Sequence, residues 1–338
     1  MIVEMTTGSS REEVDKVVER ARLMGLRVQL NVGTDRTVVA ILGSNTGALP
    51  TDTFAVLPGV ESVTRIMKPY KLASRDFRSG GSVVNINGVE VGGGRVVVMA
   101  GPCAVENEEQ MVTIAGMVRD SGASILRGGA FKPRTSPFNF QGLEEEGLKL
   151  LARARERFDI PVVTEVVDPH DVDMVARYAD ILQVGSRNMQ NFALLSSVGR
   201  SQRPVLLKRG FACTVTEWLT AADYILAEGN SRVILCERGI RTFEDSTRFS
   251  LDISSIPVIK HYSHLPVIVD PSHAAGNYSL VPAMAKASIA AGADGLLIEV
   301  HPNPKEALVD GPQSLTPSDF ARLMTELDSV SRAVGRCL

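Results

Sequence analysis

Four residues far apart in the chain offer the side chains that a divalent transition metal ion prefers. They supply a thiolate, an imidazole and two carboxylates, and they are Cys103, His273, Glu299 and Asp310. Mixed sulfur, nitrogen and oxygen ligation suits Mn²⁺, Fe²⁺, Co²⁺ or Zn²⁺ better than Mg²⁺. Taken singly, a cysteine after Gly-Pro is often a small buried side chain, and an aspartate before glycine often forms a turn. As a set they predict one divalent metal, whose identity stays open.

A second group of residues is cationic and lies at the ends of apolar or Gly-rich segments. Its members are Arg127, Lys132, Arg134, Arg187, Lys208 and Arg238. Positive charges gathered at one site repel each other and are costly to desolvate unless anions pair with them. Because the planar fork of arginine fits phosphate and carboxylate oxygens, the group predicts one or two substrates with several negative charges. The alternative, a solvated rim, fits Arg209 or Arg241 better.

One carboxylate, Glu165, is expected opposite this cationic group. It could serve as a general base, or it could simply pair with Lys132. The residues alone leave both interpretations open.

Positioning these side chains requires a repeated structural unit. Eight apolar, β-rich runs recur with helical periods between most of them: RVVVMA, SILRGG, PVVTEV, DILQVG, PVLLKRG, RVILCERG, LPVIVD and DGLLIEV. Eight buried strands alternating with helices predict a parallel sheet that closes into a (β/α)8 TIM barrel. All eight ends carry polar or ionisable groups, as the active-site end of such a barrel does. A doubly wound open sheet is the alternative, although no GxGxxG follows an early strand.

Residues 1–68 predict a smaller ferredoxin-like α+β domain that precedes the barrel. Ser10 can cap a helix with Glu13 completing a capping box, and strand patterns on either side give a βαββαβ order, with a turn at 33–35. Residues 69–94 then form a linker and a hairpin, and residues 95–338 form the catalytic barrel. The small domain could serve folding, oligomerisation or regulation.

Composition excludes several classes of function. The 338-residue chain carries a net charge of −3 and 5% aromatic residues, which argues against nucleic-acid binding. We find no apolar run of the length that spans a membrane, no secretion signal and no CxxC pair. We therefore expect a cytoplasmic protein without nucleic-acid or membrane partners.

Several motifs together resemble the 3-deoxy-D-arabino-heptulosonate 7-phosphate (DAHP) synthase family, of the type related to 3-deoxy-manno-octulosonate 8-phosphate synthase. They are GPCAVE, LRGGAFKPRTSPFNFQG, QVGSRNMQNF, PVLLKRG, ILCERGIRTFE, VDPSHAAG and EVHPNPKEALVDGPQSL. The resemblance covers the chain from Arg95 to its C-terminus, and KPRTS with GPC and DPSH is a specific combination. Residues 1–68 resemble the ferredoxin-like domain that serves feedback control in some members.

The resemblance implies a metal-dependent, aldol-like condensation of phosphoenolpyruvate with erythrose 4-phosphate, which opens the shikimate pathway for aromatic amino acids. It implies that Cys103, His273, Glu299 and Asp310 bind the metal. It places the phosphoenolpyruvate phosphate at Arg187, Lys208 and Arg238, and the carboxylate at Arg127 and Lys132. Arg134, Thr135 and Ser136 match the erythrose 4-phosphate site. Catalytic roles fall to Lys132 as proton donor, Glu165 as the residue that orients a water, and the ligands Cys103 and His273.

Other functions remain as alternatives. An octulosonate synthase would use arabinose 5-phosphate, but its matching segment reads more like KANRSS than KPRTS. A Schiff-base aldolase would need Lys208 as its nucleophile, and a barrel without activity could serve as an amino-acid sensor. For the small domain we expect inhibition by tyrosine or phenylalanine in a homo-oligomer, a tetramer or a dimer. His170, His261, His264 and His301 receive no role.

Overall fold

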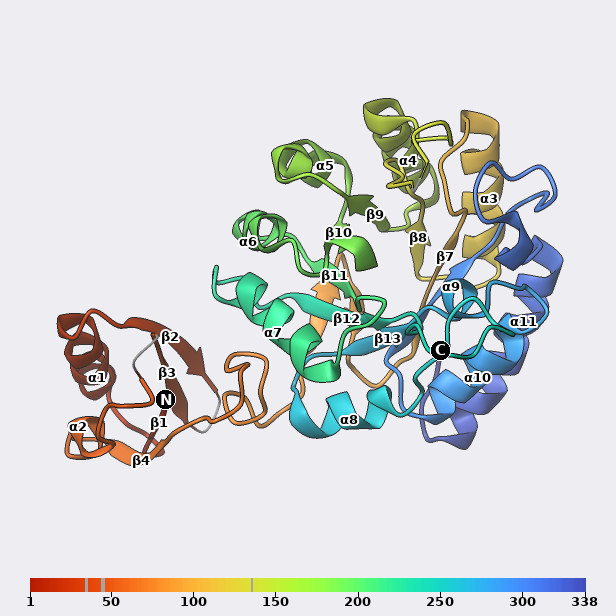
Figure 1. Cartoon of the computed structure of the whole chain (residues 1–338). Helices are drawn as coiled ribbons and strands as arrows, with labels where there is room; N and C mark the ends of the chain where they lie inside the picture. The colour runs from red at the N-terminus through yellow and green to blue at the C-terminus, as the bar shows by residue number, and fades with distance from the viewer. Residues whose placement is uncertain (34–35, 44–45, 135) are drawn as a thin grey trace. The chain divides into compact units, whose positions relative to one another are not determined.

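The computed structural model describes residues 1–338 except 34–35, 44–45 and 135 (Figure 1). Its internal contacts divide the chain into two units. One comprises residues 1–81 with 262–264, and the other comprises residues 82–261 with 265–338.

The first unit has the predicted ferredoxin-like arrangement. Its elements are β1 (Ile2–Met5), α1 (Arg11–Leu23), β2 (Arg27–Val32), β3 (Thr37–Leu42), α2 (Asp52–Ala55) and β4 (Val60–Thr64). The strands pair antiparallel in the order β2-β3-β1-β4. The predicted turn at 33–35 lies largely outside the described residues.

The capping box at the start of α1 is confirmed. The Ser10 hydroxyl accepts a hydrogen bond from the Glu13 amide at 3.3 Å, and the Glu13 carboxylate accepts one from the Ser10 amide at 2.7 Å. These bonds satisfy donors that a helix leaves free at its N-terminus. The helix then buries Val14, Val17 and Ala21 in the apolar core that it forms with the sheet.

The second unit is a closed barrel of eight parallel strands, as predicted, and the open-sheet alternative is wrong. The strands are β7 (Val97–Gly101), β8 (Ile125–Arg127), β9 (Val162–Val166), β10 (Ile181–Val184), β11 (Val205–Lys208), β12 (Val233–Glu237), β13 (Val267–Val269) and β14 (Gly295–Glu299). β14 pairs with β7, which closes the circle. Their buried side chains make near-continuous apolar runs, because both faces of each strand are covered.

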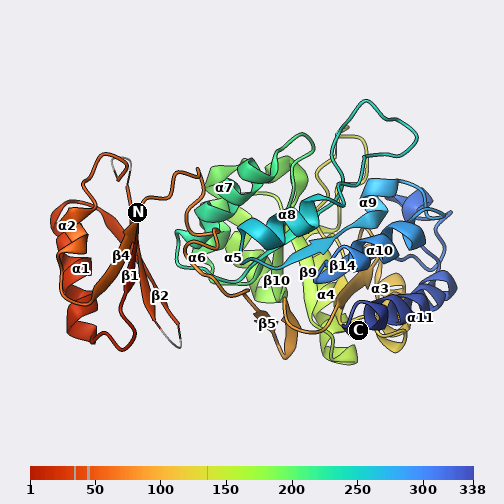
Figure 2. The same ribbon diagram turned by 90° about the horizontal axis from the view of Figure 1, so that it is seen from below.

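Helices surround the strands on the outside (Figures 1 and 2). They are α3 (Glu108–Asp120), α4 (Glu144–Phe158), α5 (Val172–Tyr178), α6 (Phe192–Arg200), α7 (Val215–Leu226), α8 (Ser255–Tyr262), α9 (Pro271–Ala275), α10 (Val281–Ala290) and α11 (Pro317–Ala333), with 3₁₀ turns η1 (Pro169–Asp171), η2 (Ser186–Asn188) and η3 (Gly311–Gln313). The connection after β12 contains the eight-residue helix α8, and residues 239–254 form a long loop before it; the expectation that this helix is the weakest is wrong, since α5 has seven residues. Among the described residues, no helix combines the length and the apolar character needed to cross a bilayer.

A hairpin precedes the barrel and is also confirmed. β5 (Val84–Ile86) and β6 (Val89–Val91) pair antiparallel. Val84, Ile86 and Val91 join an apolar cluster with inward-facing residues of the barrel strands. The hairpin therefore completes the core beneath the strand ends that carry the polar residues.

Candidate metal and anion site

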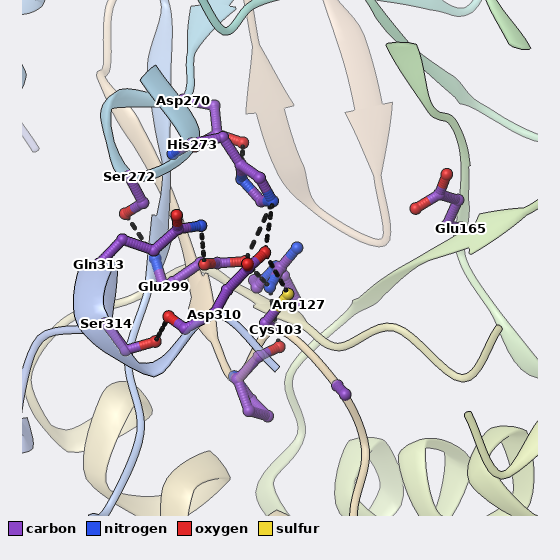
Figure 3. Close-up of polar contacts among 12 residues, drawn as sticks. Cys103, Arg127, Glu165, Asp270, Ser272, His273, Glu299, Asp310, Gln313 and Ser314 are labelled. Carbon is purple, nitrogen blue, oxygen red and sulfur yellow. Dashed lines mark hydrogen bonds and ion pairs between the residues drawn. The ribbon is translucent and has the colours of Figure 1, made fainter. Parts of the chain in front are cut away.

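The structure brings the four candidate metal ligands together. Cys103 follows β7, His273 lies in α9 after β13, Glu299 ends β14, and Asp310 precedes η3. One potential ligand atom from each lies within 4.8 Å of the other three (Figure 3). The Cys103 Sγ lies 3.3 Å from Asp310 Oδ2, and the His273 Nε2 lies 3.4 Å from Glu299 Oε1 and 3.6 Å from Asp310 Oδ2. This group of four is called the donor group below.

Local backbone geometry makes the convergence possible. β7 and β13 both flank β14, so their C-terminal ends lie side by side. Gly101 ends β7 at a φ of 153°, and a Cβ there would meet the Arg127 carbonyl oxygen at 2.1 Å. Asp310 has a φ of 56°, in the left-handed region that aspartate tolerates better than most residues. Its neighbour Gly311 packs against the Pro304 carbonyl, which leaves no room for a side chain.

Asp270 orients the imidazole of His273. Its Oδ2 accepts a hydrogen bond from His273 Nδ1 at 2.7 Å, which leaves Nε2 to face the other donors. The same Oδ2 accepts a bond from Lys208 Nζ at 2.6 Å. Burial favours a neutral Asp270, but the charges of His273 and Lys208 outweigh it and hold its pKa well below the usual range. A carboxylate behind a metal-binding histidine commonly fixes the tautomer in this way.

The electrostatics of the donor group fit a bound cation. Burial raises the pKa of the Cys103 thiol strongly, and the Glu299 charge raises it further. A thiol in this place becomes a thiolate only if positive charge is supplied beside it, which is what a metal ion does. Lys132 Nζ lies 3.1 Å from Cys103 Sγ, and Arg127 Nη1 lies 2.8 Å from Glu299 Oε1.

Beside the donor group lies a cavity of about 210 Å³ that is rich in cationic side chains; we call it the anion cavity. Its charged lining residues are Lys132, Arg134, Glu165, Arg187, Arg238, Arg241, Arg248 and Asp310, and His273 also lines it. Cations outnumber carboxylates in this lining. Such an excess at one point is stable only when anions pair with it.

Arg238 gives the clearest indication of an anion site. Its side chain is 3% exposed, and its Nη1 is buried without a hydrogen-bond partner among the residues that the structure describes. The guanidinium lies 4.0 Å from the Phe249 ring centroid and 4.9 Å from that of Phe211. Burial lowers the pKa of Arg238 to about 10. A buried guanidinium that contacts aromatic faces is available to donate hydrogen bonds to an anionic oxygen.

The other predicted residues divide into three sets. Lys132, Arg134, Glu165 and Arg187 line the anion cavity with Arg238. Arg127 and Lys208 do not line it, since each is buried in an ion pair, with Glu299 and Asp270 respectively. Ser136 is also absent from the lining, and Thr135 lies outside the described residues.

Sequence reasoning missed two cavity arginines and a glutamine. Arg241 was expected to be an exposed rim residue; it is exposed, and it nevertheless lines the cavity. Arg248 contacts Asp310, and Gln313 contacts Glu299. Arg248 and Gln313 come after irregular stretches of chain, where no hydrophobic periodicity indicates which way a side chain points.

Glu165 does not pair with Lys132. In the described part of the chain it makes no ion pair, and its Oε2 accepts a hydrogen bond from Gln183 Nε2 at 3.2 Å. A Cβ on Gly185 would lie 1.9 Å from Glu165 Oε1, so glycine leaves the space that this carboxylate occupies. The ion-pair interpretation is therefore wrong, and the Glu165 carboxylate lines the anion cavity.

The interpretation of Arg209 as a solvated rim residue is also wrong. Its side chain is 5% exposed, and its Nη1 lies 2.8 Å from both Glu237 Oε2 and Asp252 Oδ2. Glu237 ends β12 and is itself fully buried. Arg209 is buried because these two carboxylates neutralise it.

We expect Arg209→Met to destabilise the protein by about 3–5 kcal/mol, because it leaves the Glu237 charge buried without its partner. Urea unfolding at neutral pH measures the change. The matched control is Arg241→Met, which removes an exposed arginine and should shift stability by no more than about 0.5 kcal/mol. Equal stability of the two variants would contradict the structural role of Arg209.

A closed barrel with ionisable side chains gathered at the C-terminal ends of its strands is typical of TIM-barrel enzymes. Comparison with known proteins narrows the class. The DAHP synthetase I family matches residues 58–334, and the DAHP synthase ferredoxin-like domain matches residues 1–68. The chain belongs to the DAHP synthetase I family, and the prediction that it is an enzyme of the DAHP synthase type, a transferase, is confirmed.

Individual relatives agree with this assignment. The chain is 47% identical to a phospho-2-dehydro-3-deoxyheptonate aldolase of Thermotoga maritima over 99% of both chains. The crystal structure of such an aldolase (DAHP synthase) from Thermotoga maritima superposes with a TM-score of 0.80 at 47% identity, over 99% of this chain and 98% of that one. A 2-dehydro-3-deoxyphosphooctonate aldolase of Desulfatibacillum aliphaticivorans is 32% identical, over 74% of this chain and 97% of the relative.

Proposed function

We propose that the chain condenses phosphoenolpyruvate with erythrose 4-phosphate in a metal-dependent, aldol-like reaction that yields DAHP and inorganic phosphate. This reaction is the first step of the shikimate pathway. The observation that carries the proposal is the donor group lying directly beside a cavity in which the buried Arg238 Nη1 has no hydrogen-bond partner among the described residues.

Cys103, His273, Glu299 and Asp310 would hold one divalent ion, with Mn²⁺, Fe²⁺, Co²⁺ and Zn²⁺ all suited to these donors. When bound, the ion polarises the aldehyde oxygen of the aldose, so that its carbon becomes a better electrophile. Support for a single site comes from Asp270, which turns the His273 Nε2 toward the other three donors.

The cationic residues would bind and orient two mutually repelling anions. Arg187 and Arg238 would hold the phosphate of phosphoenolpyruvate, while Arg134, with Thr135 and Ser136, would hold that of the aldose. Lys208 and Arg127 already pair with Asp270 and Glu299, so they would contact the phosphate and carboxylate with their remaining N–H groups. Much of the barrier reduction would come from this positioning.

The bond changes follow from this arrangement. Carbon 3 of phosphoenolpyruvate attacks the aldehyde carbon, and the aldehyde oxygen takes a proton from Lys132. Water adds to carbon 2, where positive charge develops, and gives its proton to Glu165. Phosphate then leaves that carbon by cleavage of the carbon–oxygen bond, while the hydroxyl that water supplied becomes the ketone oxygen and its proton leaves with the phosphate. The Glu165 Oε1 has no partner among the described residues, which leaves it available to orient the water.

Gly185→Ala tests the role of Glu165 without altering the carboxylate itself. The added methyl group would collide with Glu165 Oε1, so the side chain must move from its place in the cavity. We expect kcat to fall by about 100-fold, the effect of losing a positioned proton acceptor, with little change in KM for phosphoenolpyruvate. Unchanged kcat, in steady-state assays of phosphate release, would remove Glu165 from the mechanism.

The competing function is octulosonate synthesis from arabinose 5-phosphate. The KPRTS segment and the 47% identity to a heptonate aldolase, against 32% for an octonate aldolase, favour the four-carbon aldose. Phosphate release with each aldose and phosphoenolpyruvate tests the proposal. Erythrose 4-phosphate should give at least about 100-fold higher kcat/KM, a difference of roughly 2.7 kcal/mol; preference for arabinose 5-phosphate, or no release with either, would reject it.

A Schiff-base aldolase is disfavoured by the surroundings of Lys208. Its Nζ lies 2.6 Å from the buried Asp270 carboxylate, and this contact engages the nitrogen that would have to attack a carbonyl carbon. Borohydride trapping with substrate should therefore leave Lys208 unlabelled.

The ferredoxin-like unit would regulate the barrel. We propose that it binds tyrosine or phenylalanine in a homo-oligomer, a tetramer or dimer, and that binding inhibits the enzyme. Deletion of residues 1–68 should abolish inhibition by these amino acids while phosphate release persists; inhibition that survives the deletion would reject the idea. Size-exclusion chromatography with light scattering should give a mass of two or four chains, and a monomer would contradict the assembly.

A further inference from the structure

Arg248 has no part in the function proposed above, yet it lies at the boundary between the anion cavity and the donor group. It belongs to the long loop after β12. The loop is fixed to α9, the helix of His273, by bonds from the Arg248 and Phe249 amides to the carbonyls of Ala275 and Ala274, at 3.2 and 2.9 Å. Gly276 permits this close approach, since a Cβ there would lie 2.6 Å from the Arg248 Cβ.

One nitrogen of Arg248 makes two contacts. Its Nη1 donates to Asp310 Oδ1 at 3.2 Å and to Gln313 Oε1 at 2.8 Å. Gln313, which is 2% exposed, links Arg248 to Glu299, because its Nε2 donates a hydrogen bond to Glu299 Oε2. An amide can accept on one side and donate on the other, whereas a carboxylate or an apolar side chain cannot.

These contacts divide the oxygens of both carboxylates in the same way. Asp310 turns Oδ2 toward Cys103 Sγ and His273 Nε2, while its Oδ1 is held by Arg248. Glu299 turns Oε1 toward His273 Nε2, and this oxygen also accepts a bond from Arg127 Nη1 at 2.8 Å, while its Oε2 is held by Gln313. Each carboxylate therefore offers a single oxygen to the donor group, and Figure 3 shows the bond that joins Gln313 to Glu299.

We propose that Arg248 and Gln313 act as a positioning pair that holds Asp310 and Glu299 as one-oxygen donors and thereby sets the affinity for the divalent metal. The inference rests on the proposed metal site. Simple charge repulsion predicts the opposite effect of Arg248, because a guanidinium next to a metal ion weakens binding of that ion. The two explanations therefore predict opposite changes in the Kd for the metal ion when Arg248 is replaced.

Titration of metal-free protein with Co²⁺ separates them, since the thiolate-to-cobalt absorption band reports coordination by Cys103. We expect Arg248→Met and Gln313→Leu each to raise the Kd for Co²⁺ by about 10-fold or more, the usual cost of losing a residue that orients a ligand, and to change the band. The double variant should bind no more than about twofold more weakly than the weaker single variant, because both residues act through one chain of contacts.

Arg241→Met is the matched control, because it removes the same charge from the same cavity without touching a donor. Its Kd and spectrum should stay close to those of the unaltered protein. An Arg248→Met protein that binds Co²⁺ as tightly as this control, with the same band, would overturn the inference. Should Arg248→Met fail to fold without metal, Arg248→Lys, which keeps one donor, should give an intermediate Kd, and an unchanged Kd would likewise overturn it.

The titration also distinguishes this inference from the proposed function. If the unaltered protein shows no thiolate band that saturates at one Co²⁺ per chain, the metal site itself is wrong. If the band is present but the Arg248 and Gln313 variants behave like the Arg241→Met control, the metal site is supported and the proposed positioning pair is wrong.

Discussion

Cys103→Ala is expected to abolish metal-dependent turnover while the barrel stays folded. The substitution removes the only sulfur donor of the donor group. Loss of the bound ion would forfeit several kcal/mol of transition-state stabilisation, which corresponds to a fall in kcat/KM of about a thousandfold. Phosphate release from phosphoenolpyruvate and erythrose 4-phosphate measures turnover, and metal analysis of the purified protein measures occupancy.

The control for Cys103→Ala is Cys337→Ala, which removes an exposed thiol far along the chain from the donor group. It should retain full metal content and full activity. Far-ultraviolet circular dichroism should show the same fold for both variants. Near-normal activity of the Cys103 variant with a full complement of metal would refute the assignment of this ligand.

Arg238→Met should show opposite effects on catalysis and on stability. The guanidinium is buried, its Nη1 lacks a hydrogen-bond partner within the described part of the chain, and burial lowers its pKa to about 10. Removing an unpaired buried charge relieves a desolvation cost, so the substrate-free variant should be more stable by about 1 kcal/mol or more. The same change removes a charge-assisted contact to phosphate, so kcat/KM for phosphoenolpyruvate should fall by about 100-fold or more.

Thermal unfolding with and without phosphoenolpyruvate measures both effects. Ligand should raise the midpoint of the unaltered protein and have little effect on Arg238→Met. Arg134→Met serves as a comparison, since its half-buried side chain lines the same cavity and its loss should mainly affect use of the aldose. A variant of Arg238 that is less stable yet fully active would show that this residue supports the fold instead of the substrate.

The barrel could be predicted because its signals are local. The apolar runs are separated by helical periods, and one of these periods, residues 144–158, forms α4. The capping box at Ser10 and Glu13 likewise lies within a single turn of chain. Such patterns depend on neighbours in sequence, so one chain suffices to recognise them.

Convergence of the donor group could also be predicted, because barrel closure makes β7, β13 and β14 neighbours. The partners of the buried charges could not. The sequence predicts Lys208 and Arg127 as ligands of substrate anions, but their pairing with Asp270 and Glu299 depends on tertiary packing across the barrel. Arg209 was misjudged for the same reason, since Glu237 and Asp252 lie well away from it in sequence.

Anomalous diffraction from a crystal soaked with Mn²⁺ tests the proposed metal site. We expect one peak per chain, within about 2.0–2.4 Å of Cys103 Sγ, His273 Nε2 and one carboxylate oxygen each of Glu299 and Asp310, values typical of divalent ions with such ligands. A peak bound elsewhere, or crystals in which these four side chains bind no common ion, would contradict it.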